Sequence, residues 1–557
     1  MSATRGCGLK VDDETCYFDG SCDHGSMKHV DLDALMSLYA SCEDSDSLKA
    51  PNELSVSTRA LSEDVPALSS LVFEEDDDYR REVEASWGES TCDVPLELGR
   101  PDGSTGGFYG VMRETRNLRA KIVERLLQQG SSSPCVPEVQ ALSAALATLR
   151  SMARPCGWKA GDDDSLHVLL VDSLPVCVRL GYEKSELIRD LRFLEGGEGK
   201  LLDLLREEHT RTEWLEAEVP SWEDSLERAL AAMRGALSDG RGVAASGLRF
   251  RNMITDRDGT INNYCDRYPS SVQSIYNSLW LGSFARGCTD NTIIITAAPV
   301  GGRSGTEGLM ELCTMPRDFV RCAGSKGREY YDPESGKVLE IEPLPAGVHD
   351  LLDQVHSRIS SLCAQPENAK FLGMGSGLQR KFGEITVARN DVSKTVDEAE
   401  SHRFMGQVRC LVEEVDREGD MLDMQDTGSD LEIFPRRANG QPCFTKGDGV
   451  MSLDRRLSLQ VAEGPNLICG DTPSDVPMIE AALSLMSTSE SDGTLTSAGK
   501  LAVLFVVTPE QHRRTPDLAE TVRSLCSDSG ARCAILPSPD ALIAALARFQ
   551  HGRPVHF

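Results

Sequence analysis

The stretch 253–264, MITDRDGTINNY, joins the end of an apolar run to two carboxylates that are one residue apart. The run begins near residue 248 and predicts a buried strand, so Asp256 and Asp258 would stand at its carboxyl end. In open α/β sheets, ligands bind at this edge. Taken alone, such a pair is more often a solvated turn, because Asp and Gly favour turns. The interpretation therefore depends on what the other strands carry.

Alternating strands and helices follow this stretch to the end of the chain. Short apolar runs at 292–296 (TIIIT), 466–469 (NLIC) and 501–507 (LAVLFVV) predict further strands, and each precedes a helix-like stretch. A last strand and helix are expected at 533–549. This alternation is typical of a mostly parallel sheet with helices on both faces. We therefore expect an α/β, Rossmann-like core.

Three further polar stations accompany these strands. Thr296 ends the second strand, and Lys446 lies in the stretch FTKGDG. Asp471 and Asp475 follow the strand NLIC in the stretch GDTPSD. Each station alone has an ordinary structural explanation, since hydroxyls cap backbone groups and exposed lysines are usually only solvated. Together they indicate a magnesium and phosphate site, because carboxylates that converge from two strands need a cation, and a lysine and a hydroxyl can hold phosphate oxygens.

The four stations, in this order, resemble the four motifs of the haloacid dehalogenase superfamily of phosphotransferases. Three more stretches are similar to the trehalose-6-phosphate phosphatase family, above all to its longer nematode-type members. They are AGSKGRE (323–329), DLEIFP (430–435) shortly before FTKG, and the closing CAILPSPDALIAALARF. The likeness covers roughly residues 106–557. It implies a haloacid dehalogenase core in two parts, 246–335 and 431–557.

The resemblance implies a role for each station. Asp256 would attack the phosphorus atom and form an aspartyl-phosphate. Asp258 would protonate the leaving alkoxide and then activate the hydrolytic water. Thr296 and Lys446 would bind phosphoryl oxygens. The implied Mg²⁺ ligands are Asp256, the main-chain carbonyl of Asp258 and Asp471, with Asp475 supporting the site.

The texture of the chain differs between residues 336 and 430, where an alternating stretch and a helical stretch predict an inserted α+β subdomain. The resemblance implies that this insertion is a cap that covers the core and selects the sugar. The residues expected to contact a sugar belong to the AGSKGRE step, the cap strand and its exit: Lys326, Lys381, Glu384, Arg389 and Glu432. For the cap residues, an exposed alternating strand is an equally good explanation.

Two further parts are expected before the core of this 557-residue chain. Residues 1–105 interleave Ser, Asp and Glu and predict a disordered acidic leader. Residues 106–245 change to a helical period, with amphipathic segments at 137–152, 166–181 and 183–209, and predict a helical bundle. The expected role of this bundle is self-association or docking of a protein partner rather than catalysis.

Charge and cysteine usage narrow the class of protein. The net charge of −30 and the pI of about 4.8 argue against nucleic acid or an anionic membrane as a partner, because both would repel the chain. The 18 cysteines form no CxxC pair, which favours free thiols in a reducing compartment. The start MSATRGCGLKVDDETC has no apolar signal region, and no run approaches the ~18 apolar residues of a membrane span. We therefore expect a cytoplasmic protein.

The leading hypothesis is an Mg²⁺-dependent phosphatase that hydrolyses trehalose 6-phosphate to trehalose and phosphate. A phosphatase or phosphomutase acting on another sugar phosphate would share the same stations, and a phosphomutase would release no phosphate into solution. A third hypothesis is a non-catalytic scaffold whose core binds sugar phosphate while the helical bundle and the leader dock partners. Intact residues at all four stations favour an enzyme over the scaffold.

Overall fold

A computed structural model of the chain describes most residues from 108 onward, and the structural statements below refer to these residues. The described ranges are 108–129, 136–152, 154–155, 167–171, 174–178, 180–211, 221–238, 249–265, 267–302, 307–391, 394–436, 443–487 and 497–551. The expected acidic leader, residues 1–105, lies outside them. No helix within these ranges is both long and apolar enough to cross a membrane.

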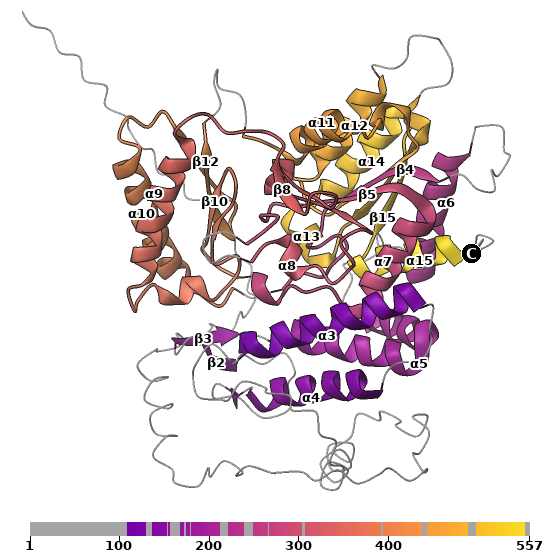
Figure 1. Ribbon diagram of the computed structural model, residues 1–557, viewed down its shortest axis with the longest axis horizontal. Coiled ribbons are helices and arrows are strands. Elements are labelled where there is room, and N and C mark those ends of the chain that lie inside the picture. The colour runs from indigo at the N-terminus through magenta and orange to yellow at the C-terminus, as the bar shows by residue number, and fades with distance from the viewer. Residues whose placement is uncertain are drawn as a thin grey trace, which may run out of the picture. The chain divides into compact units, whose positions relative to one another are not determined.

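An eight-stranded sheet forms the centre of the core (Figure 1). Its order is β15-β14-β13-β4-β5-β6-β7-β8, with parallel neighbours from β15 to β6 and antiparallel pairing of β7 and β8. The predicted α/β, Rossmann-like fold class is confirmed. The strand bounds are β4 Phe250–Thr255, β5 Thr289–Ile295, β6 Arg321–Gly324, β7 Glu329–Asp332, β8 Lys337–Glu340, β13 Asn466–Gly470, β14 Leu501–Val506 and β15 Arg532–Leu536.

Both faces of this sheet are buried. Successive residues of each central strand point to opposite sides, and both sets belong to hydrophobic clusters. Met253 and Leu467 belong to one hydrophobic cluster, whereas their neighbours Ile254 and Ile468 belong to another. Strands of this kind appear in the sequence as unbroken apolar runs. The helices α6 Trp222–Leu237, α7 Ile275–Cys288 and α15 Pro539–His551 contribute to the first cluster, and α11 Lys446–Leu457, α12 Val476–Ser487 and α14 Leu518–Ser529 contribute to the second.

The inserted subdomain has an antiparallel sheet of its own, ordered β11-β12-β10-β9. Its apolar face packs on two helices, α9 and α10. The bounds are α9 Val348–Cys363, β9 Leu378–Arg380, β10 Ile385–Ala388, α10 Glu398–Val415, β11 Leu422–Asp426 and β12 Asp430–Pro435. Because β8 belongs to the core sheet and β12 to the inserted sheet, the subdomain starts and ends later than the expected 336–430. A short strand does not reveal from its own residues which sheet it joins.

The segment before the core contains the helices α3 Phe108–Gln129, α4 Val136–Met152 and α5 Gly181–Arg211. The amphipathic helix expected at 166–181 is wrong, since this segment forms an antiparallel hairpin of β2 His167–Val171 and β3 Leu174–Val178. Both runs are short and rich in Val, which favours strands, and periodicity alone does not separate a short apolar strand from a helix. The remaining strand and α-helices among the described residues are short: β1 Arg154–Pro155, α8 Leu309–Leu312 and α13 Pro509–Arg514.

Candidate active site

The carboxyl end of β4 carries Asp256 into a buried site. The Asp256 main-chain N–H donates to the Cys469 carbonyl oxygen at 3.0 Å, so the ladder between β4 and β13 continues past the strand. Only 5% of Asp256 is exposed. The ammonium of Lys446, the first residue of α11, lies 2.6 Å from Asp256 Oδ1 and 2.5 Å from Asp475 Oδ1. This lysine therefore bridges carboxylates that follow two neighbouring strands.

The loop after β13 holds its two aspartates in different ways. Asp475 Oδ2 accepts hydrogen bonds from the main-chain N–H groups of Asp471 at 3.1 Å and Thr472 at 2.9 Å, which fix its orientation. Asp471 Oδ1 accepts a hydrogen bond from the Thr260 hydroxyl at 2.7 Å. Asp471 Oδ2 accepts one from the Tyr264 hydroxyl at 2.9 Å. Both hydroxyls come from the stretch MITDRDGTINNY, which therefore contacts the β13 loop at several points.

Burial controls the charge of this site. Desolvation raises the pKa of Asp256 to about 7, although the Lys446 ammonium opposes the shift. Desolvation, together with the carboxylates of Asp475 and Asp256, raises the pKa of Asp471 well above its usual range. Burial lowers the pKa of Lys446, but the adjacent carboxylates of Asp256 and Asp475 outweigh it and raise the pKa above its ordinary value. One lysine faces three buried carboxylates, so the site favours a further positive charge.

The three buried aspartates fit a small divalent cation. Carboxylate oxygens of Asp256, Asp471 and Asp475 lie within 4.8 Å of one another. Hard oxygen ligands of this kind suit Mg²⁺, and the excess of carboxylates over ammonium groups is the charge that such an ion neutralises. The side chain of Asp258 is not part of this group.

Asp258, the second carboxylate of the opening pair, has different surroundings. Its Oδ1 accepts hydrogen bonds from the Arg257 guanidinium and the Ser271 hydroxyl, each at 2.6 Å. Arg257 is buried, whereas 24% of the Asp258 side chain is exposed. Gly259 follows with a φ of +87°, and a Cβ atom there would lie 2.2 Å from Asp471 Oδ2. A glycine is therefore required where this turn approaches the β13 loop.

Thr296 directly follows β5 and is buried. Its N–H donates to the Ala323 carbonyl oxygen at 3.1 Å, and its own carbonyl oxygen accepts from the Lys326 N–H at 2.9 Å. The Thr296 hydroxyl oxygen accepts from the Ala298 N–H at 3.3 Å. Thr296 therefore lies at the same carboxyl edge of the sheet as Asp256, and its main chain is hydrogen-bonded to that of Lys326.

A lysine–glutamate cluster, formed by Lys326, Lys381, Glu384 and Glu432, joins the core to the inserted subdomain. Lys326 Nζ lies 2.7 Å from Glu384 Oε2 and 3.1 Å from Glu432 Oε2. Lys381 Nζ lies 2.9 Å from Glu384 Oε1. Desolvation would raise the pKa of Glu384, but the two lysines overcome it and lower this pKa to about 2. The structure thus brings together all but one of the residues expected to contact a sugar.

Arg389, the remaining residue expected to contact a sugar, lies elsewhere. Its guanidinium lies 3.0 Å from Asp426 Oδ2, donates to the Ser401 hydroxyl at 3.2 Å, and pairs with Glu398 on α10. Arg389 follows β10, whereas Glu384 precedes it, so the length of the strand separates the two side chains. The structure does not bring Arg389 to the lysine–glutamate cluster.

Two close-fitting glycines set the Lys326 step against helix α11. A Cβ atom on Gly449 would lie 2.0 Å from the Lys326 carbonyl oxygen, and one on Gly327 would lie 2.7 Å from the Gly449 Cα atom. Gly327 also has a φ of +96°. Because α11 begins at Lys446, the backbones that carry the two site lysines touch each other.

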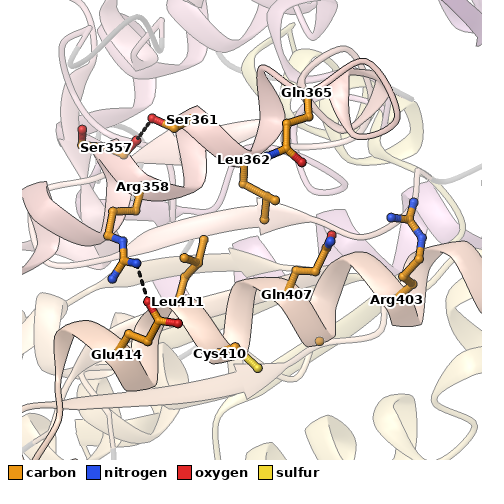
Figure 2. A pocket seen from close by; sticks show the side chains of 11 residues that line it. Ser357, Arg358, Ser361, Leu362, Gln365, Arg403, Gln407, Cys410, Leu411 and Glu414 are labelled. Atoms are coloured by element: carbon orange, nitrogen blue, oxygen red, sulfur yellow. Dashed lines mark hydrogen bonds and ion pairs between the residues drawn. The ribbon is translucent and has the colours of Figure 1, made fainter.

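An open groove of about 820 Å³ lies between α9 and α10 (Figure 2). Its lining combines polar side chains with the apolar Leu362 and Leu411, and Arg358 pairs with Glu414 across it. These helices cover the apolar face of the inserted sheet, whereas Glu432 alternates along β12 with the apolar residues of that face. The groove therefore lies on the other side of the inserted sheet from the lysine–glutamate cluster.

Sequence reasoning missed four side chains of the site, and one of them, Ser271, lies 13 positions from Asp258, which it contacts. Gln511 in α13 donates to Asp471 Oδ2, and nothing in the sequence near Gln511 marks this contact. Tyr264 and Arg257 lie inside the stretch MITDRDGTINNY. Their nearness to the aspartate pair in sequence was a usable signal, because polar residues beside a strand end share its surroundings.

The fold and the site define a class of protein. A parallel sheet ordered β14-β13-β4-β5-β6, with aspartates after β4 and β13 and an α+β subdomain inserted before α11, is the arrangement of haloacid dehalogenase-type proteins. Residues 253–542 match the family model described as trehalose-6-phosphate phosphatase, C-terminal. The chain belongs to this family.

Two of the relatives among known proteins come from nematodes. An alpha,alpha-trehalose-phosphate synthase (UDP-forming) 2 of Caenorhabditis elegans is 27% identical over 444 residues, which are 79% of this chain and 33% of that protein. A trehalose-phosphatase of Brugia malayi is 31% identical over 299 residues, which are 53% of this chain and 56% of that protein. The chain thus spans about a third of the length of the synthase and about half of that of the phosphatase. Few residues follow residue 542, so the match to the synthase must include part of the segment before the family domain.

Solved structures also resemble this chain. One of Aspergillus fumigatus trehalose-6-phosphate phosphatase aligns with 60% of this chain and 99% of its own, at 15% identity and a TM-score of 0.31. The C-terminal domain of the Candida albicans trehalose-6-phosphate phosphatase aligns with 62% of this chain and 100% of its own, at 13% identity and a TM-score of 0.37.

Proposed function

We propose that this chain is an Mg²⁺-dependent phosphatase that hydrolyses trehalose 6-phosphate to trehalose and phosphate, in trehalose biosynthesis. The observation that carries the proposal is the buried group of Asp256, Asp471 and Asp475 around Lys446 at the carboxyl edge of the sheet. Membership of the trehalose-6-phosphate phosphatase family supports both the reaction and the substrate.

Asp256 is the proposed nucleophile. Its carboxylate attacks the phosphorus atom, the bond between phosphorus and the sugar oxygen breaks, and an aspartyl-phosphate forms. Lys446 holds Asp256 Oδ1 at 2.6 Å and leaves Oδ2 for the attack. When bound by Asp256 and Asp471, with Asp475 in support, Mg²⁺ supplies positive charge that keeps Asp256 ionised despite its raised pKa and offsets the charge of the phosphoryl oxygens. Lys446 and the Thr296 hydroxyl bind the phosphoryl oxygens.

Asp258 is the proposed general acid and base. A partly exposed carboxyl two residues from the nucleophile can protonate the leaving sugar oxygen and later accept a proton from the water that hydrolyses the aspartyl-phosphate. Arg257 and Ser271 hold its Oδ1, so Oδ2 is the atom that transfers the proton. The catalytic effect of the whole site is then largely positioning and charge stabilisation.

The lysine–glutamate cluster is the proposed site for the sugar. It offers both donors and acceptors in a partly buried place, as recognition of hydroxyl groups requires. It also joins the core to the inserted subdomain, so a sugar bound there would bridge the two. Arg389 is left out of this proposal because its partners belong to another part of the subdomain.

A panel of sugar phosphates, assayed for released phosphate with and without Mg²⁺, tests the proposal. We expect the highest kcat/KM for trehalose 6-phosphate and loss of activity when the metal is chelated. Preference for another sugar phosphate would reject the substrate but keep the reaction. Full activity in the presence of a chelator would reject the metal.

A second candidate function is a non-catalytic sugar-phosphate-binding scaffold. In this alternative the core binds the sugar phosphate and releases no phosphate from it. The variant Asp256→Asn separates the two functions. If the variant binds trehalose 6-phosphate and the unchanged chain releases no phosphate from it, the scaffold is correct.

A further inference from the structure

The loop 261–274, described except for residue 266, touches the proposed active site at two points. Near its start, the Tyr264 hydroxyl donates to Asp471 Oδ2 at 2.9 Å. Near its end, the Ser271 hydroxyl donates to Asp258 Oδ1 at 2.6 Å. The conformation of this loop therefore bears on the orientation of both a proposed metal ligand and the proposed general acid.

The helix α5, which precedes the family domain in the sequence, holds this loop through a buried ion pair. The Arg267 guanidinium lies 2.6 Å from Glu183 Oε1, and the Ser270 hydroxyl donates to the same oxygen at 2.9 Å. The side chains of Glu183 and Arg267 are 0% and 1% exposed. The guanidinium also lies over the Phe108 ring of α3, 4.9 Å from its centre. A loop arginine is thus enclosed by two helices that lie outside the core sheet.

Two more carboxylates of α5 reach the same region from one face of the helix, since residues three and four positions apart are neighbours there. Glu186 Oε1 accepts from the Asn263 amide at 3.3 Å, beside Tyr264. Asp190 Oδ1 accepts from the Ile275 main-chain N–H at 2.7 Å, where the loop ends and α7 begins. The helix therefore holds the start, the middle and the end of the loop.

We propose that Glu183 is a positioning residue of the active site, and that α5 holds the 261–274 loop so that Ser271 and Tyr264 meet Asp258 and Asp471. Glu183 binds the Ser270 hydroxyl directly, and Ser271 is the next residue in the chain. No atom of Glu183 is assigned to the reaction. The kinetic part of this inference rests on the proposed phosphatase function.

The physical reason lies in the burial of the pair. Loss of the Glu183 charge removes the carboxylate that lies 2.6 Å from the buried Arg267 guanidinium, and this weakens the hold of α5 on the loop. Small displacements of groups that orient the reacting atoms reduce the rate strongly even when binding persists. The predicted signature is a fall in kcat with little change in KM, because the sugar contacts in the lysine–glutamate cluster stay in place.

The test compares Glu183→Gln with Glu198→Gln in the full chain. Glu198 lies in the same element, just beyond a break in the helix at Gly197. It accepts from the Trp280 indole N–H of α7, at 2.8 Å, and none of its described contacts is with the loop. We expect Glu183→Gln to lower kcat for the preferred substrate roughly ten- to a hundredfold with KM within about twofold, and Glu198→Gln to leave both within about twofold. Equal kinetics of the two variants in folded protein would overturn the proposal.

A double-mutant cycle with Arg267→Gln supplies a check against simple destabilisation. If Glu183 acts through Arg267, the losses in kcat of the two single variants are not additive, and the double variant loses little more than either one. Additive losses would overturn the proposal. Thermal unfolding of each variant shows whether the protein assayed is folded.

Amide hydrogen exchange keeps the test independent of activity. Faster exchange in residues 261–274 of Glu183→Gln than of Glu198→Gln supports the positioning role, and equal exchange contradicts it. If the unchanged chain and Glu198→Gln both release no phosphate from any substrate, the phosphatase proposal fails, and the exchange result alone decides whether α5 holds the loop.

Discussion

The phosphate end and the sugar end of the proposed substrate site are built on different principles. At the phosphate end, three buried carboxylates face one lysine, and the carboxylates follow two neighbouring strands of a single sheet. At the sugar end, two lysines balance two glutamates, and the partners come from the core and from the inserted subdomain. In the first arrangement, carboxylates outnumber ammonium groups. In the second arrangement, positive and negative charges are equal in number, and its ion pairs can be exchanged for hydrogen bonds to hydroxyl groups.

The largest expected effect is at the nucleophile. Asp256→Asn removes the only atom assigned to attack phosphorus, so we expect kcat for phosphate release to fall by at least about 10⁴-fold. The control is Asp423→Asn, which removes a carboxylate from the exposed edge of the inserted sheet and should leave kcat unchanged. If Asp256→Asn keeps more than about a hundredth of the activity, another group is the nucleophile.

Lys446→Met tests the charge excess of the phosphate end. Loss of the ammonium leaves Asp256 and Asp475 without their buried partner, so the free energy of unfolding in a chelator should fall by about 3–5 kcal/mol. Added Mg²⁺ should restore part of it, as measured by urea unfolding. Lys370→Met, which breaks a more exposed pair with Glu400, should cost about 1 kcal/mol or less and show no response to Mg²⁺. Equal losses in the two variants would contradict the excess of buried carboxylates at the phosphate end.

Glu384→Gln breaks the sugar end alone. One charged acceptor between Lys326 and Lys381 is lost, so kcat/KM for trehalose 6-phosphate should fall about 10- to 100-fold, mainly through KM. Hydrolysis of p-nitrophenyl phosphate, which lacks a sugar, should stay within about twofold. Glu367→Gln, at an exposed position of the same subdomain, serves as the control. A comparable loss with both substrates would show that the cluster acts on the phosphate end.

Arg389→Gln should have the smallest effect. Arg389 is buried but its partners Asp426 and Glu398 are more exposed, so we expect a loss of stability of about 1–3 kcal/mol and kcat/KM within about twofold. Thermal unfolding and the same two substrates measure both. A loss in kcat/KM as large as that of Glu384→Gln would show that Arg389 does contribute to sugar binding.

Strand ends could be read from the sequence because their signals are local. An apolar run followed by a polar residue predicts both a buried strand and a side chain at its carboxyl edge, which is why Asp256, Thr296 and Asp471 could be named in advance. The hairpin at 167–178 could not, since a short apolar run has no period long enough to separate strand from helix. The pair of Glu183 and Arg267 could not either, because 84 positions separate the two residues and neither neighbourhood marks the other. The separation of Arg389 from Glu384 could not be predicted for a related reason. The two residues lie at opposite ends of β10, and the sequence does not show which residues surround each end.

The close contact of Gly327 with Gly449 fixes the distance between the backbones that carry Lys326 and Lys446. Gly327 and Gly449 leave no room for a side chain, so the backbones at Lys326 and α11 are in direct contact, and a side chain at either glycine would force them apart. One lysine belongs to the sugar end and the other to the phosphate end, and the span between them is therefore set by the backbone. A substrate of another length would have to be accommodated by side chains of the inserted subdomain, because the positions of Lys326 and Lys446 in the core are fixed relative to each other.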